Sequence, residues 1–143
     1  MPLTMDINSA AKKLNLSETT IKHYKFNYAE ADNYAKGNPE VIGLDVTIDF
    51  REILSSDGSP AANKQLVQDL RDWAEYDPRE TGSFEEYYRE VSLNNYFGEN
   101  EVREIALSDA YVNKATESVD LLSGKHTLTL ELLQKEDMLG YGD

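Results

Sequence analysis

The feature that most constrains the fold is a strict alternation of apolar and polar side chains over residues 41–50. Apolar side chains occupy every second position, at Ile42, Leu44, Val46, Ile48 and Phe50, and Val41, Gly43, Asp45, Thr47 and Asp49 lie between them. Successive side chains of a strand point to opposite faces, so this pattern predicts a strand with one buried and one more polar face. Such strands are typical of antiparallel sheets that pack on one side only.

A second strand is predicted ahead of the first, at residues 20–29, where Tyr24, Phe26 and Tyr28 share one face. The segment between the two strands, residues 30–40, contains glycine, asparagine and proline in succession. These residues favour turns, so the segment is predicted to be a long hairpin loop.

One helix follows this strand pair. Ser59 and Pro60 supply an N-cap and a first-turn proline, and both are typical of a helix start. A stripe at helical spacing then predicts the buried face, and it consists of Leu66, Val67, Leu70, Trp73 and Ala74. We expect the helix to end near Tyr76, because Pro78 disfavours helical geometry at the residue before it. Residues 79–84 are predicted to be a loop.

Further strands are predicted at residues 87–96, 101–112 and 126–133, with turns at 97–100 and 121–125. The expected fold is therefore mainly β, a small antiparallel β-barrel or sandwich with one α-helix packed on it. Its core is predicted to contain Ile48, Trp73, Leu107, Leu128 and Leu130. At 143 residues the chain is expected to be a single domain, 1–143, with a variable N-terminal segment at 1–18 and a flexible tail at 136–143.

The charge balance limits the classes of partner. Lys and Arg number 14 against 27 Asp and Glu, which gives a net charge of −13. This excess repels phosphate backbones and anionic lipid, so neither nucleic acid nor membrane insertion is expected. The chain contains no cysteine, which excludes disulfides and thiolate chemistry. The first six residues lack the basic and apolar regions of a signal peptide, so we expect the chain to start in the cytoplasm.

No residue set predicts catalysis, a cofactor or a metal site. His23 and His126 are the only histidines, and they have no metal-ligand spacing between them. Asp45 and Asp49 share the predicted polar face of one strand, but nothing else in the sequence indicates that they act as an acid–base pair. Trp73 is most simply a core residue. We therefore expect no enzyme activity, with no catalytic, cofactor-binding or metal-binding residues.

One segment invites a different interpretation. Residues 8–24 can be read as a helix-turn-helix, with small residues at Ala10 and Ala11 and a possible cap at Ser17. The supposed recognition helix, however, continues into β-branched and aromatic residues that favour a strand. Residues 20–28 are accordingly predicted to be strand, and a DNA-binding regulator is the least favoured function.

Several local strings resemble a known family. Residues 70–74, Leu-Arg-Asp-Trp-Ala, resemble the end of the family helix, and residues 105–112, Ile-Ala-Leu-Ser-Asp-Ala-Tyr-Val, resemble one of its strands. Residues 126–130, His-Thr-Leu-Thr-Leu, are similar to its final strand. Over residues 20–135 the chain resembles the Hcp-type tube proteins of type VI secretion systems and the related tail-tube proteins of contractile, phage-like tails. Residues 1–18 do not look like the usual first strand, although 11–16 could serve as one, and residues 83–88 look like an insertion.

The resemblance implies a structural subunit of the inner tube of a contractile injection system. It implies stacked hexameric rings that contact sheath and baseplate or spike proteins, and effector cargo in the lumen. Assembly would take place in the cytoplasm, and ejection would carry the tube outside or into a target cell. A tube-end adaptor of the same fold and a monomeric β-rich binding module remain the alternatives, and oligomeric state separates the monomeric module from the tube.

Overall fold

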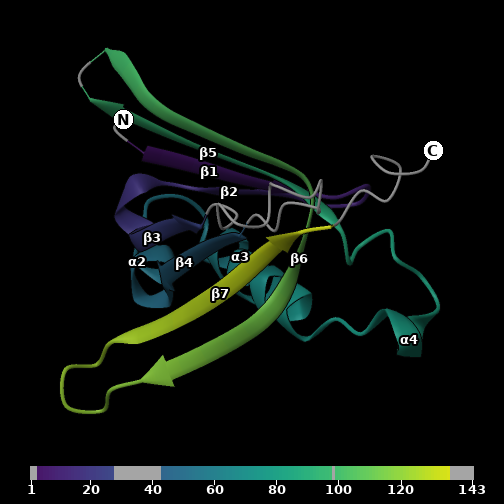
Figure 1. Ribbon diagram of the computed structural model, residues 1–143. Helices are drawn as coiled ribbons and strands as arrows, with labels where there is room; N and C mark the ends of the chain where they lie inside the picture. The colour runs from purple at the N-terminus through teal and green to yellow at the C-terminus, as the bar shows by residue number, and fades with distance from the viewer. Residues whose placement is uncertain (1–2, 28–42, 98, 136–143) are drawn as a thin grey trace.

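The computed structural model describes residues 3–27, 43–97 and 99–135, and its seven strands form one antiparallel sheet in the order β2-β1-β5-β6-β7-β4-β3 (Figure 1). The strands are β1 (Leu3–Asn8), β2 (Lys13–Leu16), β3 (Ile21–Asn27), β4 (Gly43–Asp49), β5 (Arg89–Phe97), β6 (Asn100–Val119) and β7 (His126–Gln134). The helices are η1 (Glu18–Thr20), α2 (Phe50–Leu54), α3 (Pro60–Glu75) and α4 (Pro78–Thr81). The predicted mainly β fold is confirmed, and the single predicted α-helix is α3, to which the structure adds the short helices α2 and α4.

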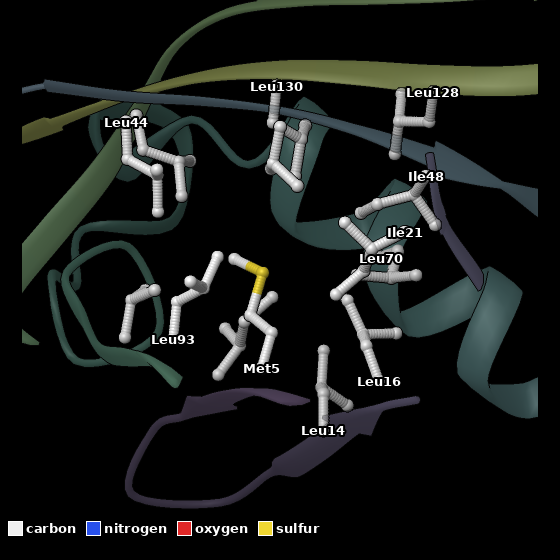
Figure 2. Close-up of a cluster of buried hydrophobic side chains, with 14 of the residues drawn as sticks. Met5, Leu14, Leu16, Ile21, Leu44, Ile48, Leu70, Leu93, Leu128 and Leu130 are labelled. Atoms are coloured by element: carbon white, nitrogen blue, oxygen red, sulfur yellow. The ribbon is translucent and has the colours of Figure 1, made fainter. Parts of the chain in front are cut away.

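The sheet curls but does not close. Figure 2 shows Met5, Leu14 and Leu16 on one side of the core and Leu44 and Leu130 on the other. The edge strands β2 and β3 follow one another through η1, yet no backbone pairing joins them among the described residues. The closed barrel of the sequence prediction is therefore not confirmed.

The core lies between the two halves of the curled sheet and beneath α2 and α3. All five residues predicted to share it are buried in one cluster. The members contributed by the helices are Phe50, Ile53, Val67, Leu70 and Trp73. On each strand the buried positions alternate with more polar ones, as the period of two requires.

Helix α3 begins and ends where its local chemistry dictates. The Ser59 side chain accepts a hydrogen bond from the backbone N–H of Ala62 at 3.3 Å, which satisfies one of the free donors of the first turn. The helix ends at Glu75, and Pro78 starts the separate short helix α4. Residues 79–84 were predicted to be loop throughout, and this was wrong over α4, which ends at Gly82 with a φ of 73°. That left-handed conformation favours glycine.

The strand predicted at 41–50 is shorter than the pattern indicated. It ends at Asp49, whose side chain accepts from the backbone N–H groups of Arg51 and Glu52 and thereby starts α2. Phe50 is buried as predicted, but in the first turn of a helix and not in a strand. Positions 41 and 42 and the predicted loop at 30–40 lie outside the described residues.

The N-terminal segment differs most from its prediction. Residues 3–8 form β1, which pairs with β5 from Leu3↔Asn95 to Asn8↔Glu90, and thus lies inside the sheet. Residues 13–16 form β2, within the stretch that could serve as a first strand. The helix-turn-helix interpretation of residues 8–24 is wrong, because this segment contains β2, η1 and the start of β3. Strand over residues 21–27 is confirmed.

Strand β6 belongs to two hairpins that point in different directions. Its first half pairs with β5 and its second half with β7, and the two meet at Ala110. In Figure 1 the β5–β6 and β6–β7 hairpins diverge from this region. The strand was predicted to end at 112, but it continues to Val119. We call residues 114–126, the outer part of the β6–β7 hairpin, the arm.

Candidate interaction surfaces

The outer face of the sheet is polar where β4 lies beside β7. The Thr47 and Thr129 hydroxyls are 3.2 Å apart on directly opposed residues. Asp45 and Glu131 are also directly opposed, and like charges in that position repel. The amides of Asn27 and Asn113 donate to these two carboxylates, at 3.4 and 3.3 Å respectively. The face thus presents hydroxyls, amides and acids to whatever lies against it.

The tip of the arm exposes two adjacent leucines. Leu121 is 90% exposed and Leu122 is 100% exposed. The turn that carries them is ordered by Asp120, whose carboxylate accepts from the backbone N–H groups of Leu122 and Ser123 at 3.0 and 3.3 Å. These hydrogen bonds, that from Ser123 above all, lower the pKa of Asp120. Two large apolar side chains are therefore held in water by a defined turn.

Charged contacts fix the arm to the body. Arg71 of α3 donates through Nε and Nη2 to both carboxylate oxygens of Glu117, at 3.1 and 2.7 Å. Glu117 Oε2 also lies 2.6 Å from Nε2 of His126. The Arg71 hydrogen bond is the main cause that lowers the pKa of Glu117, with a smaller effect from His126. Nearer the tip, Arg51 donates to the carbonyls of Ser123 and Gly124.

An aromatic cluster lies directly after the C-terminal end of α3. It consists of Tyr76, Phe84, Tyr87, Tyr88 and Tyr111, and we call it the aromatic end. Phe84 stacks on Tyr88 with ring centroids 5.7 Å apart, and Tyr87 stacks on Tyr111 at 5.6 Å. Burial raises the pKa of Tyr87, whereas Phe84 remains 55% exposed.

Buried polar groups hold the aromatic end against the rest of the molecule. Trp73 Nε1 donates to the carbonyl of Tyr87 at 2.9 Å, and the Arg89 guanidinium lies over the Trp73 ring at 5.1 Å. Arg89 is only 4% exposed, and burial lowers its pKa. Its Nε donates to the carbonyl of Glu86, whose carboxylate accepts from Ser9 at 2.5 Å. The loop after α4 is thereby tied to both α3 and the β1–β2 turn.

Most of the residues weighed as chemical candidates have structural roles here. Asp49 caps α2, Asp45 accepts from Asn27, and Trp73 is a core residue as predicted. His126 contacts Glu117 in the arm, and His23 is exposed on β3. Within the described residues there is no group of three or more His, Cys, Asp or Glu side chains that could hold a metal. None of the described helices is both long enough and apolar enough to cross a membrane.

Sequence reasoning missed both exposed apolar surfaces. The signal for the tip was present, since Leu121 and Leu122 occupy a predicted turn, where polar residues are usual. The aromatic end was recognised only as an acidic, tyrosine-rich insertion at 83–88. Of its remaining members, Tyr76 precedes this segment by one short helix, whereas Tyr111 comes from β6, and only the fold brings Tyr111 to the cluster.

Comparison with known proteins gives a likeness in structure but none in sequence family. No family model matches the sequence, and no curated protein matches it. Among solved structures, the chain is similar to one titled "Structure of Hcp1 from Flavobacterium johnsoniae". The two share 15% identity with a TM-score of 0.48, and the alignment covers 92% of this chain and 89% of that one. A likeness of this degree concerns the path of the backbone and carries no information on activity or assembly.

Proposed function

We propose that this chain is a structural subunit of the inner tube of a contractile injection system, which assembles with copies of itself into stacked rings. The observation that carries the proposal is the arm, which holds Leu121 and Leu122 in full exposure on an ordered turn. Water-exposed leucine pairs on a fixed support are costly unless another surface covers them. The tip is therefore a contact surface.

The family resemblance in the sequence supports the same function, and two of the segments that carry it lie in β6 and β7. The Asp-Ala-Tyr-Val string at residues 109–112 lies at the bend of β6, and the 126–130 string forms the start of β7. Both belong to the hairpin that projects the tip. Six copies per ring, the sheath and baseplate partners, and export by ejection are carried over from the family as parts of this proposal.

The polar face of the sheet fits the lumen of such a tube. Thr47, Thr129 and the flanking acids and amides present hydrogen-bonding groups, and Leu133, opposite Gly43, is the apolar side chain that shares this face. Cargo that passes such a surface meets mostly polar groups, whereas buried aromatic and arginine anchors dominate tight protein contacts. The proposed role as a tube subunit requires no catalytic residues.

Native mass spectrometry and negative-stain microscopy of the purified chain test the proposal. We expect closed rings, and their population should rise with added salt, because each copy carries a net charge of −13 and salt screens the repulsion between copies. A mass of one chain at every salt and protein concentration, with no rings in the micrographs, would contradict the proposal and favour a monomeric binding module.

A further inference from the structure

The arm tip and the aromatic end lie at opposite extremes of the molecule. Figure 1 shows the turn between β6 and β7 far from α4 and from the segment that follows α4. Each extreme exposes large apolar side chains, Leu121 and Leu122 at one and Phe84 at the other. A chain with two such surfaces facing apart can bind a copy of itself at each of them.

We propose, building on the proposed assembly into rings, that the Leu121–Leu122 tip of one copy docks on the aromatic end of the next copy. Such a head-to-tail contact uses two different patches, so an open row of copies keeps one free patch at each of its two ends until the ring closes. Leucine side chains packed on Phe84 and Tyr88 would match the aromatic-rich centre of protein interfaces.

The charges of the two surfaces favour this pairing over a symmetric one. The aromatic end is acidic on balance: residues 75–90 contain Glu75, Asp77, Glu80, Glu85, Glu86 and Glu90 against Arg79 and the buried Arg89, and Lys135 adds one basic group over the Tyr88 ring at 4.9 Å. The arm is balanced, with Lys114 and Lys125 against Glu117 and Asp120. Two aromatic ends in contact would oppose two acidic surfaces, whereas a tip at the aromatic end brings Lys125 to the acids.

Both surfaces are preorganised, which reduces the entropy lost on binding. Asp120 orders the turn, and Arg71 and Arg51 hold the arm on the body. The aromatic end is fixed by the hydrogen bond from Trp73 to Tyr87 and by the stacked rings. Surfaces held in their bound shape lose less freedom on association, so a small apolar contact suffices within a ring.

The absence of cysteine from the chain permits a direct test. Leu122→Cys and Phe84→Cys are introduced in separate chains, and the two proteins are mixed and oxidised with diamide. We expect a disulfide-linked pair containing one chain of each kind, and neither variant alone should form a pair. Leu54→Cys mixed with Phe84→Cys is the matched control, because Leu54 is 46% exposed but lies on α2, outside both surfaces.

Blocking variants supply an independent measurement. Leu121→Asp/Leu122→Asp removes the tip, and Phe84→Asp removes the ring that it would contact. We expect each variant alone to lose every species larger than one chain, and an equimolar mixture to form two-chain species that grow no further. Phe84→Ala and Leu121→Ser/Leu122→Ser repeat the test, and circular dichroism checks that each variant is folded.

The outcomes separate this inference from the proposed function. Rings of wild-type protein, together with rings from either blocked variant, would overturn the docking and leave the tube function standing. Disulfide-linked pairs formed by the Leu122→Cys protein alone, or by the Phe84→Cys protein alone, would also overturn the docking of tip on aromatic end and favour a symmetric contact. A wild-type chain that never associates would contradict both proposals.

Discussion

The core beneath α3 and the arm of the β6–β7 hairpin are held in place by different forces. The core is a single cluster of buried apolar side chains centred on residues such as Leu70 and Trp73. The arm, by contrast, is attached through Arg71, Glu117 and His126, which all remain partly exposed. Burial stabilises through removal of apolar surface from water, whereas exposed ion pairs contribute little and are screened by salt. Damage to the core should therefore unfold the protein, whereas damage to the arm should change only its position.

The largest effect is expected from Trp73→Ala. This change removes a 1%-exposed aromatic side chain and its hydrogen bond to Tyr87, so we expect a loss of about 3–5 kcal/mol in the free energy of unfolding. Urea denaturation at low protein concentration measures it without a contribution from association. Trp73→Phe is the control, since it keeps most of the packing. A loss below about 1 kcal/mol for the alanine variant would remove the distinction between core and arm.

A smaller effect is expected from Asp49→Ala, at the junction between β4 and α2. The Asp49 carboxylate caps α2 through the N–H groups of Arg51 and Glu52, and the loss of such a cap costs about 1 kcal/mol. Asp49→Asn should retain most of the stability, because asparagine caps helices equally well. If the two variants unfold at the same urea concentration, the cap contributes nothing to the stability of the core.

Glu117→Gln should affect the arm and leave the core intact. Because the Arg71–Glu117 pair is partly exposed, we expect a change of about 0.5 kcal/mol or less in global stability. Amide hydrogen exchange over residues 114–126 should become faster, while exchange in α3 stays unchanged. An equal increase in both regions would show that arm and core unfold as one unit.

Acidification should have the same local effect in the wild-type protein. The folded pKa of Glu117 lies below its unfolded value of about 4.3, so ionised Glu117 stabilises the arm above that value. The contribution is lost as the pH falls through the lower folded pKa. Amide chemical shifts of the arm should therefore change below about pH 4 in wild type, and the change should be smaller in Glu117→Gln.

The smallest effect on stability is expected from Leu121→Ser/Leu122→Ser. Both side chains are almost fully exposed in the monomer, so the free energy of unfolding should stay within about 0.5 kcal/mol of wild type. Thermal unfolding of the monomer at low concentration is the measurement. A clear loss of stability would mean that the tip packs within its own chain, and the contrast between arm and core would then fail.

The same contrast explains how far the sequence could be interpreted. Residues 43–49, the long helix and its cap, and the core membership of Trp73 were predicted correctly, because periodicity and capping are local signals. The strand at 3–8 was missed, since its stability depends on pairing with β5, some 90 residues later. The turn from strand to helix at Phe50 was missed for another reason, because its apolar side chain fits the buried positions of both elements.

The candidate surfaces were harder to predict than the fold. Exposure of Leu121 and Leu122 depends on how far β6 and β7 extend beyond the body, and the sequence pattern ended β6 at residue 112. The aromatic end joins residues 76, 84–88 and 111, and no local pattern links these positions. The one sequence feature that indicated an exposed apolar surface was the pair Leu121 and Leu122 in the predicted turn at 121–125.

The strand order also determines when the molecule can fold. β1 pairs locally with β2, and β4 with β3, but their second partners, β5 (Leu3↔Asn95) and β7 (Gly43↔Leu133), leave the ribosome much later. Before strands so distant in sequence can pair, the chain has to close a large loop, and the entropy lost in this step slows folding. β-rich domains fold within milliseconds to seconds. During synthesis the core that covers the apolar faces of β1 and β4 stays incomplete until β7 emerges. Because of this strand order, the nascent strands have to be protected from aggregation until synthesis is complete.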